Sequence, residues 1–171
     1  MFFYAKNMLN FIYLGGIFME YEINNETLAL IPITATTTKV VELENDYLIK
    51  KSVMEIISDS CNYFGSSLEG RLQGSKSMLG SIYKAPIIIE ESNNIIFFPT
   101  MSPQQRKTSW ISHNNILKCE KKRNKTVIYF KNSKKVELNV PYLSISNQIV
   151  RSTLLESISK NRKTFQKTAI N

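Results

Sequence analysis

The run SCNYFGSSLEGRLQGSKS, residues 60–77, concentrates residue types that could bind phosphate. It contains three glycines, five serines and two cations. A nucleotide-binding phosphate loop requires Gly-x-x-x-x-Gly-Lys-Ser/Thr between a strand and a helix, because its backbone amides and its lysine must both reach the phosphates. Here Ser75 takes the place of the second glycine, and the run follows one helical pattern and lies within another. The residues favour a surface that contacts a nucleic-acid backbone, although two capped helices packed through glycines would have the same composition.

The chain offers little for catalysis. A serine or cysteine nucleophile needs a neighbouring base, and the sequence indicates no partner for the single histidine, His113. A structural histidine near Trp110 is the simpler interpretation. The two cysteines, Cys61 and Cys119, lie far apart without Cys-x-x-Cys spacing, so we expect buried thiols in a reducing cytoplasm rather than a zinc site or a disulfide. We predict no catalytic residue, no metal and no cofactor.

The charge of the chain is divided unevenly between its two halves. The 171 residues carry a formal net charge of +8. Residues 19–100 contain six Lys or Arg and 11 Asp or Glu, whereas residues 101–171 contain 15 and three. A basic half attracts polyanions such as nucleic acids, although scattered lysines also occur on any solvated face. No helix-turn-helix, zinc-finger or RNA-recognition motif is present, so no groove is assigned by motif.

Apolar and β-branched runs predict the strands that must support these residues. The N-terminal segment 21–32 alternates and predicts two short strands or a hairpin that ends at Pro32. Further strands are expected after it, the last three forming a meander, at 38–45, 85–91, 94–100, 109–116, 116–121, 126–130 and 135–140.

Helical spacing begins at Ser52, which with Glu55 forms a capping box, and Gly65 is the expected end of this helix. A second helix is expected to start at Ser66-x-x-Glu69 and to end at Gly80. Its period predicts an inner face of three leucines and an outer face of polar residues. The inner residues are Leu68, Leu72 and Leu79, and the outer residues are Arg71, Ser75 and Lys76.

A third helix is expected to open at Pro141 and to carry six apolar residues, namely Leu143, Ile145, Ile149, Leu154, Leu155 and Ile158. After Lys160 we expect a basic flexible tail over residues 161–171. The order of elements predicts an α+β fold, with helices packed on a largely antiparallel sheet in a single domain over residues 19–160.

The first 18 residues are apolar and aromatic but lack an uncharged run long enough to span a bilayer. Leu14-Gly15-Gly16 can be encoded by the purine-rich string of a bacterial ribosome-binding site, and Met19 follows two codons later. We therefore hypothesise that residues 1–18 are translated upstream DNA and that Met19 is the natural start. An amphipathic, membrane-seeking N-terminus is the alternative.

Four segments in the middle of the chain, SCNYFGSSLEGR, KAPIII, IIFFPT and SWISH, resemble the ComK family in their order and spacing. This family comprises the competence transcription factors of Bacillus and related bacteria. The resemblance runs from about Tyr21 to about Arg151, and VPYLSISNQIVRS is similar to the segment after the family's meander. The chain departs at Leu68, where relatives often have an aromatic residue, and at Ala85, where they often have proline. It also ends a few tens of residues earlier than most members.

The resemblance implies a cytoplasmic, nucleoid-associated transcriptional activator of competence genes. It implies binding of A/T-rich promoter boxes through the minor groove, dimers or higher assemblies on paired boxes, and turnover through a protease adaptor. A basic protein without a recognition helix suits the minor groove, where A·T and G·C differ but little more can be read. The alternatives are a truncated, inactive member, a metal-dependent nucleic-acid-processing enzyme, and a basic protein-interaction module.

Three groups of residues are the candidates for DNA contact. The first lies beside Gly65, Gly70 and Gly74, where hydroxyl groups and backbone amides could approach phosphate. The second is an amide-rich basic loop suited to minor-groove acceptors, and the third is a hairpin tip expected to contact phosphate. Their members are Ser66, Ser67, Arg71 and Lys76; Gln104, Gln105, Arg106 and Lys107; and Lys122, Arg123 and Lys125.

Overall fold

The computed structural model describes residues 13–14, 17–18 and 20–168, with side chains over 20–165. A large sheet has the strand order β1-β2-β5-β4-β3-β8-β7-β6, and a second sheet has the order β11-β10-β9. Described neighbours are antiparallel except β2 and β5. The large sheet contains β1 (Tyr13–Leu14), β2 (Ile17–Phe18), β3 (Thr27–Thr34), β4 (Thr37–Glu42), β5 (Asp46–Ile49), β6 (Ile87–Glu90), β7 (Ile95–Pro99) and β8 (Trp110–Ser112). The second contains β9 (Ile116–Lys122), β10 (Lys125–Phe130) and β11 (Lys135–Leu138).

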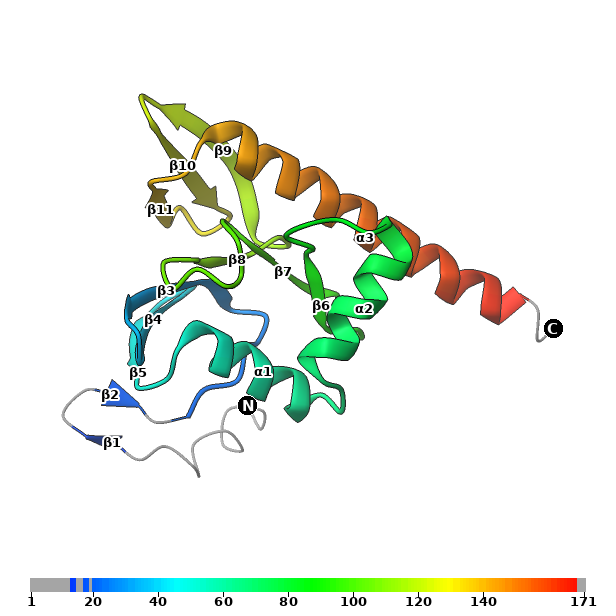
Figure 1. Cartoon of the computed structure of the whole chain (residues 1–171), viewed down its shortest axis with the longest axis horizontal. Coiled ribbons are helices and arrows are strands. Elements are labelled where there is room, and N and C mark those ends of the chain that lie inside the picture. Colours follow the sequence, from blue (N-terminus) through cyan, green and yellow to red (C-terminus); the bar gives the residue numbers. More distant parts are fainter. Residues whose placement is uncertain (1–12, 15–16, 19, 169–171) are drawn as a thin grey trace.

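In the described part of the chain, three helices accompany the sheets: α1 (Val53–Tyr63), α2 (Leu68–Leu79) and α3 (Tyr142–Thr168). The second, smaller sheet lies beside the start of α3, and α2 lies beside the later turns of α3 (Figure 1). The predicted α+β fold with a largely antiparallel sheet is therefore confirmed. No helix in the described part of the chain is both long and apolar enough to span a membrane.

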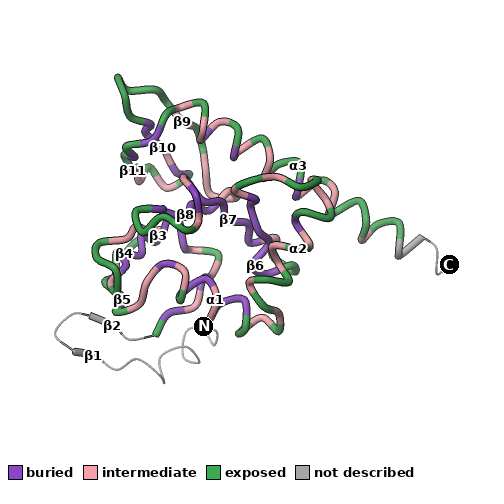
Figure 2. Tube along the Cα trace, in the orientation of Figure 1, coloured by how far each residue is buried: buried purple, intermediate pink, exposed green. Residues whose placement is uncertain are grey.

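The core lies on both faces of the large sheet, because successive strand residues point to opposite sides. Phe97 and Trp110 join the cluster under α1, whereas Phe98 and Ile111 join a second cluster with the small sheet and the start of α3. These four side chains are fully buried. Figure 2 shows the buried residues concentrated along the central strands, while the tip of the hairpin formed by β9 and β10 and the later turns of α3 are largely exposed.

The N-terminal prediction was wrong in detail. Residues 20–24 are irregular, and the chain turns at 25–26 into a single strand, β3. The Asn24 side-chain oxygen accepts a hydrogen bond from the Glu26 backbone N–H at 2.8 Å, which supports the turn. Tyr21 is buried and its hydroxyl contacts Thr27 and Glu42, so side-chain bonds hold this segment in place of a strand ladder. The hypothesis that residues 1–18 are a leader falls outside the described residues, except for β1 and β2.

Helix α1 forms as predicted. The Ser52 hydroxyl accepts from the Glu55 N–H at 3.3 Å, and the Glu55 carboxylate accepts from the Ser52 N–H at 2.7 Å. This reciprocal capping box satisfies two backbone donors that the first turn leaves without helical partners. The helix ends at Tyr63 with Phe64 as its C-cap, and Gly65 has a φ of +75°, a left-handed conformation that glycine adopts without strain.

Helix α2 differs from the prediction in its cap and in its buried face. Ser67, not Ser66, is the N-cap, and its hydroxyl accepts from the Gly70 N–H at 3.0 Å. Ser75 is buried, and only 14% of the Arg71 side chain is exposed, so the prediction that both face outward was wrong. The reason is that α2 packs against α1 on one side and against β6 and α3 on another. Only a narrow face, which includes Lys76, remains in solvent.

Helix α3 continues beyond the position where we expected it to end. It spans 27 residues, a length of about 40 Å at 1.5 Å per residue. The expected flexible tail is therefore helical as far as Thr168, and residues 169–171 lie outside the described part. Leu155 and Ser159 are buried against the body of the protein, and Lys163 Nζ donates to the Glu91 carbonyl oxygen at 2.9 Å. These contacts anchor the later turns.

Candidate nucleic-acid interface

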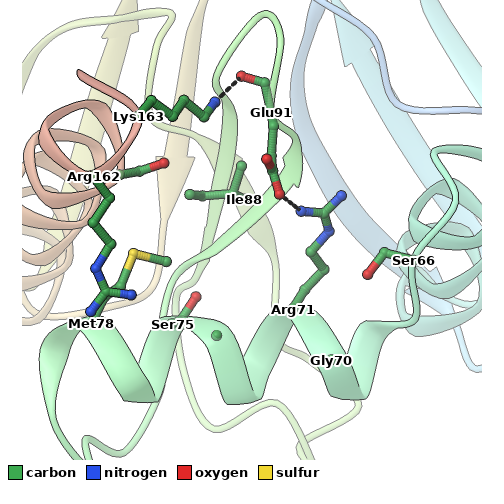
Figure 3. Close-up of a pocket in the computed structure, with 11 residues that line it drawn as sticks. Ser66, Gly70, Arg71, Ser75, Met78, Ile88, Glu91, Arg162 and Lys163 are labelled. Carbon is green, nitrogen blue, oxygen red and sulfur yellow. Dashed lines mark hydrogen bonds and ion pairs between the residues drawn. The ribbon is translucent and has the colours of Figure 1, made fainter. Parts of the chain in front are cut away.

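Two members of the first candidate group, Ser66 and Arg71, line a groove between α2 and α3. Its volume is about 380 Å³. The lining residues come from α2, from β6 and the turn after it, and from α3: Ser66, Gly70, Arg71, Gly74, Ser75, Met78, Ile88, Glu91, Ser159, Arg162 and Lys163. Figure 3 shows Arg71 reaching from α2 toward Glu91, while Arg162 reaches from α3 toward Met78.

The members of this group have different roles in the structure. The hydroxyl of Ser67 is used as the α2 cap, whereas Ser66 lines the groove. Arg71 Nη1 donates to Glu91 Oε1 at 2.6 Å, so this cation already has a carboxylate partner. Lys76 is exposed, and within the described residues it has no ion pair. Ser66 and Arg71 therefore share the groove, while Ser67 and Lys76 lie outside it.

The second group is an exposed loop between β7 and β8. Residues 104–107 are all exposed, and buried Ser102 and Thr108 flank them. The Gln105 N–H donates to the Ser102 carbonyl at 2.9 Å, and the Thr108 N–H donates to the Gln105 carbonyl at 3.0 Å. The Ser102 hydroxyl also donates to the Gln104 side-chain oxygen. Hydrogen bonds thus fix the ends of the loop, and its two side-chain amides and two cations are exposed to solvent.

A smaller hollow of about 200 Å³ lies beside this loop. Gln104, Gln105 and Arg106 line it together with residues 52–54 at the start of α1 and with Pro32, Thr34 and Ala35 near the turn between β3 and β4. Lys107 is not among its lining residues. The loop is therefore positioned against the N-terminal end of α1, away from the groove of the first group.

The third group occupies the tip of the hairpin formed by β9 and β10. Lys122 and Lys125 both contact Glu137 on β11, at 3.2 and 2.7 Å. Hydrogen bonds from Lys125 and then Lys122 lower the pKa of the Glu137 carboxyl below its ordinary value. Arg123 lies between them with a φ of +54° and is exposed, with no ion pair among the described residues. Of the three predicted cations, Arg123 is the one most available to a phosphate.

The structure adds cations that the sequence analysis did not select. Arg162 and Lys163 line the groove with Arg71, and Lys121 lines a third hollow with Arg123 and the start of α3. The sequence does not indicate Arg162 and Lys163 as candidates, because the basic composition of residues 161–171 predicts a flexible tail. Their signal was the helical spacing itself, since buried Leu155 and Ser159 place residues 162 and 163 on the same face.

Neither the histidine nor the cysteines form a catalytic arrangement. His113 Nε2 lies 3.7 Å from Glu156 Oε2, and burial lowers the pKa of His113 although Glu156 opposes this. Cys61 is buried as predicted, and burial raises the pKa of its thiol to about 11. Cys119 is only half-buried, contrary to the prediction. Among residues with described side chains, no three His, Cys, Asp or Glu lie where they could share a metal ion.

Comparisons with known proteins identify the family. A model of the ComK protein family matches residues 18–164. The chain belongs to the ComK family. The competence transcription factor of Bacillus subtilis (strain 168) is 31% identical to this ComK-family chain over 147 residues, which is 84% of this chain and 77% of the relative. No solved structure matches it. The predicted resemblance is therefore confirmed, and the ComK match includes all three candidate groups as well as Arg162 and Lys163.

Proposed function

We infer that this ComK-family chain is a DNA-binding transcriptional activator of competence genes and acts without enzymatic chemistry. The observation that carries this proposal is its 31% identity, over 84% of its length, to a protein named competence transcription factor. The family match over residues 18–164 covers the small sheet, the large sheet apart from β1 and Ile17, and most of α3, so it includes the scaffold and the exposed basic residues together.

The placement of the charges supports DNA as the partner. Residues 101–171 contribute 15 Lys or Arg against three Asp or Glu, and their free cations lie on exposed segments. Arg106, Lys107, Lys121, Arg123 and Arg162 have no ion pair within the described residues. Cations of this kind release counterions from the phosphate backbone when they bind, which gives sequence-independent affinity. Position on the duplex is set by such phosphate contacts, while base contacts provide specificity.

The loop 104–107 is the best candidate for reading bases. Its two glutamines and two cations are the residue types that contact the acceptors of a narrow A·T minor groove. Its hydrogen-bonded base and exposed tip suit insertion into a groove that a helix cannot enter. We propose that it reads A/T-rich promoter boxes, while the hairpin tip at Arg123 and the α2 region contact phosphates.

Other properties belong to the same proposal and are supported by family membership. They are assembly as dimers or higher oligomers on paired boxes, turnover through a protease adaptor, and location at the nucleoid in the cytoplasm. A two-fold assembly on DNA would space its half-sites by the helical repeat of the duplex.

The test is a binding titration against a duplex with two spaced A/T boxes and a G/C-rich duplex of equal length. The function predicts preference for the A/T duplex and loss of that preference with a competing minor-groove drug. A promoter reporter that carries the same boxes then measures activation. Equal affinity for both duplexes would contradict base reading, and specific binding without reporter output would indicate a member that binds but does not activate.

A further inference from the structure

The groove between α2 and α3 collects three cations from two elements that are distant in the sequence. Arg71 comes from α2, and Arg162 and Lys163 come from α3. Figure 3 shows the Arg71 and Arg162 side chains toward opposite ends of the groove, with Ser75 of α2 between them. Glu91 supplies the one acidic side chain of the described lining. The groove therefore keeps an excess of positive charge even with Glu91 ionised.

The Glu91 carboxylate contacts Arg71 as an oxygen of an anionic ligand would. Arg71 Nη1 donates to Glu91 Oε1 at 2.6 Å, and the Arg71 side chain is 14% exposed while that of Glu91 is 55% exposed. Arg71 Nε is buried and has no hydrogen-bond partner among the described residues. A guanidinium binds carboxylate and phosphate oxygens through the same planar set of donors. The cation is thus held in place, whereas its acidic partner can move toward solvent.

Gly74 on the groove side of α2 is not explained by folding. A Cβ at this position would meet no atom within 4 Å, and the residue does not have the left-handed backbone conformation that requires glycine. Alanine is the better helix former, so the packing leaves room for a side chain here and helix propensity favours one. The absent side chain instead leaves the backbone of α2 open to close approach. Approach of a ligand is the remaining physical reason for glycine at this point.

We propose that the α2–α3 groove binds a phosphate of the DNA backbone, and that Glu91 occupies the place of that phosphate on Arg71 in the free protein. This inference rests on the proposed function. On binding, the phosphate takes the Arg71 donors, Glu91 turns to solvent, and Arg162 contacts the same strand from the α3 side. Glu91 is therefore an internal competitor that weakens DNA binding.

The first test is Glu91→Gln, with Asp59→Asn as the control. Asp59 lies on α1, its carboxylate is 2.8 Å from Lys51 Nζ, and 46% of its side chain is exposed. Its substitution therefore removes the same charge from a comparable ion pair outside the groove. Because exposed ion pairs contribute up to about 1 kcal/mol, Glu91→Gln should tighten DNA binding by about two- to fivefold. The Asp59→Asn variant should change the DNA affinity by less than about half of the factor expected for Glu91→Gln. In an Arg71→Ala background the gain from Glu91→Gln should vanish.

The second test is Gly74→Ala, which separates DNA contact from folding. Thermal unfolding followed by circular dichroism should give an equal or higher Tm, because alanine favours the helix and has room. DNA binding should weaken by about threefold or more, because the added methyl group obstructs close approach of the strand. Binding equal to that of the wild type would overturn the role of the groove, as would Glu91→Gln behaving like Asp59→Asn. If the wild-type chain bound no duplex, the proposed function itself would fail.

Discussion

The identity of the α2 cap gives a prediction about folding that two adjacent serines can test. Ser67 Oγ accepts from the Gly70 N–H at 3.0 Å, and Ser67 has the extended backbone of an N-cap, with φ −116° and ψ 153°. Ser66 precedes this position and lines the groove. Ser67→Ala should therefore remove the cap of α2, whereas Ser66→Ala should leave it intact.

The magnitude follows from the one hydrogen bond that is lost. Replacement of an N-cap serine by alanine costs about 1 kcal/mol, and a kcal/mol shifts Tm by about 2–4 °C for a chain of this size. We expect Ser67→Ala to lower the free energy of unfolding by about 1 kcal/mol and Ser66→Ala to stay within about 0.5 kcal/mol of the wild type.

The assay is urea unfolding of both variants, followed by circular dichroism. The unfolding midpoint should fall for Ser67→Ala at an unchanged slope with denaturant, which is the sign of a change in stability alone. DNA titrations of the same proteins then show whether Ser66 contributes to binding without affecting folding. A larger loss of stability for Ser66→Ala than for Ser67→Ala would refute the assignment of the cap.

Three further predictions concern the hairpin, the half-buried histidine and α3. Arg123→Ala should lower the steepness of log affinity against log salt concentration by about one, as expected for the loss of one phosphate contact. Lys122→Ala should lower it less, because Lys122 is already paired with Glu137. DNA titrations at several salt concentrations measure both effects. Burial depresses the pKa of His113 in the folded state, so the unfolded state binds the proton more readily. The free energy of unfolding should therefore fall as the pH drops below the ordinary pKa of 6.5. Unfolding measurements from pH 7.5 to 5.5 test this, and the free energy of unfolding of His113→Gln should decrease less than that of the wild type. Leu155→Ala should cost about 2–5 kcal/mol in urea unfolding because its side chain is fully buried, whereas Leu154→Ala should cost less than about 1 kcal/mol at 50% exposure.

The sequence predicted helices and strands well where residues close together in the chain determine the backbone geometry. Ser52 and Glu55 defined the start of α1, and Gly65 its end, because caps depend on neighbours in the sequence. The strands of the meander followed from runs of β-formers separated by short polar turns. In each case the decisive contact lies within a few residues, so the pattern contains it.

The errors arose where tertiary contacts decide the outcome. The period of α2 predicted one buried face, but packing against both α1 and α3 buried Ser75 and most of Arg71 as well. The basic residues after Lys160 suggested a tail, although Ser159 and the contact of Lys163 with Glu91 hold them in a helix. Glu91 lies 20 residues from Arg71 and 72 from Lys163, and single-sequence patterns do not pair such residues.

The measurement that tests the central claim most directly is a titration against duplexes whose boxes contain A·T, inosine·C or G·C pairs. Inosine lacks the N2 amino group of guanine, so an inosine·C pair resembles A·T in the minor groove and G·C in the major groove. A reader of the minor groove should bind the inosine·C boxes within about threefold of the A·T boxes and should lose affinity for G·C boxes. Inosine·C boxes that bind as weakly as G·C boxes would contradict minor-groove recognition.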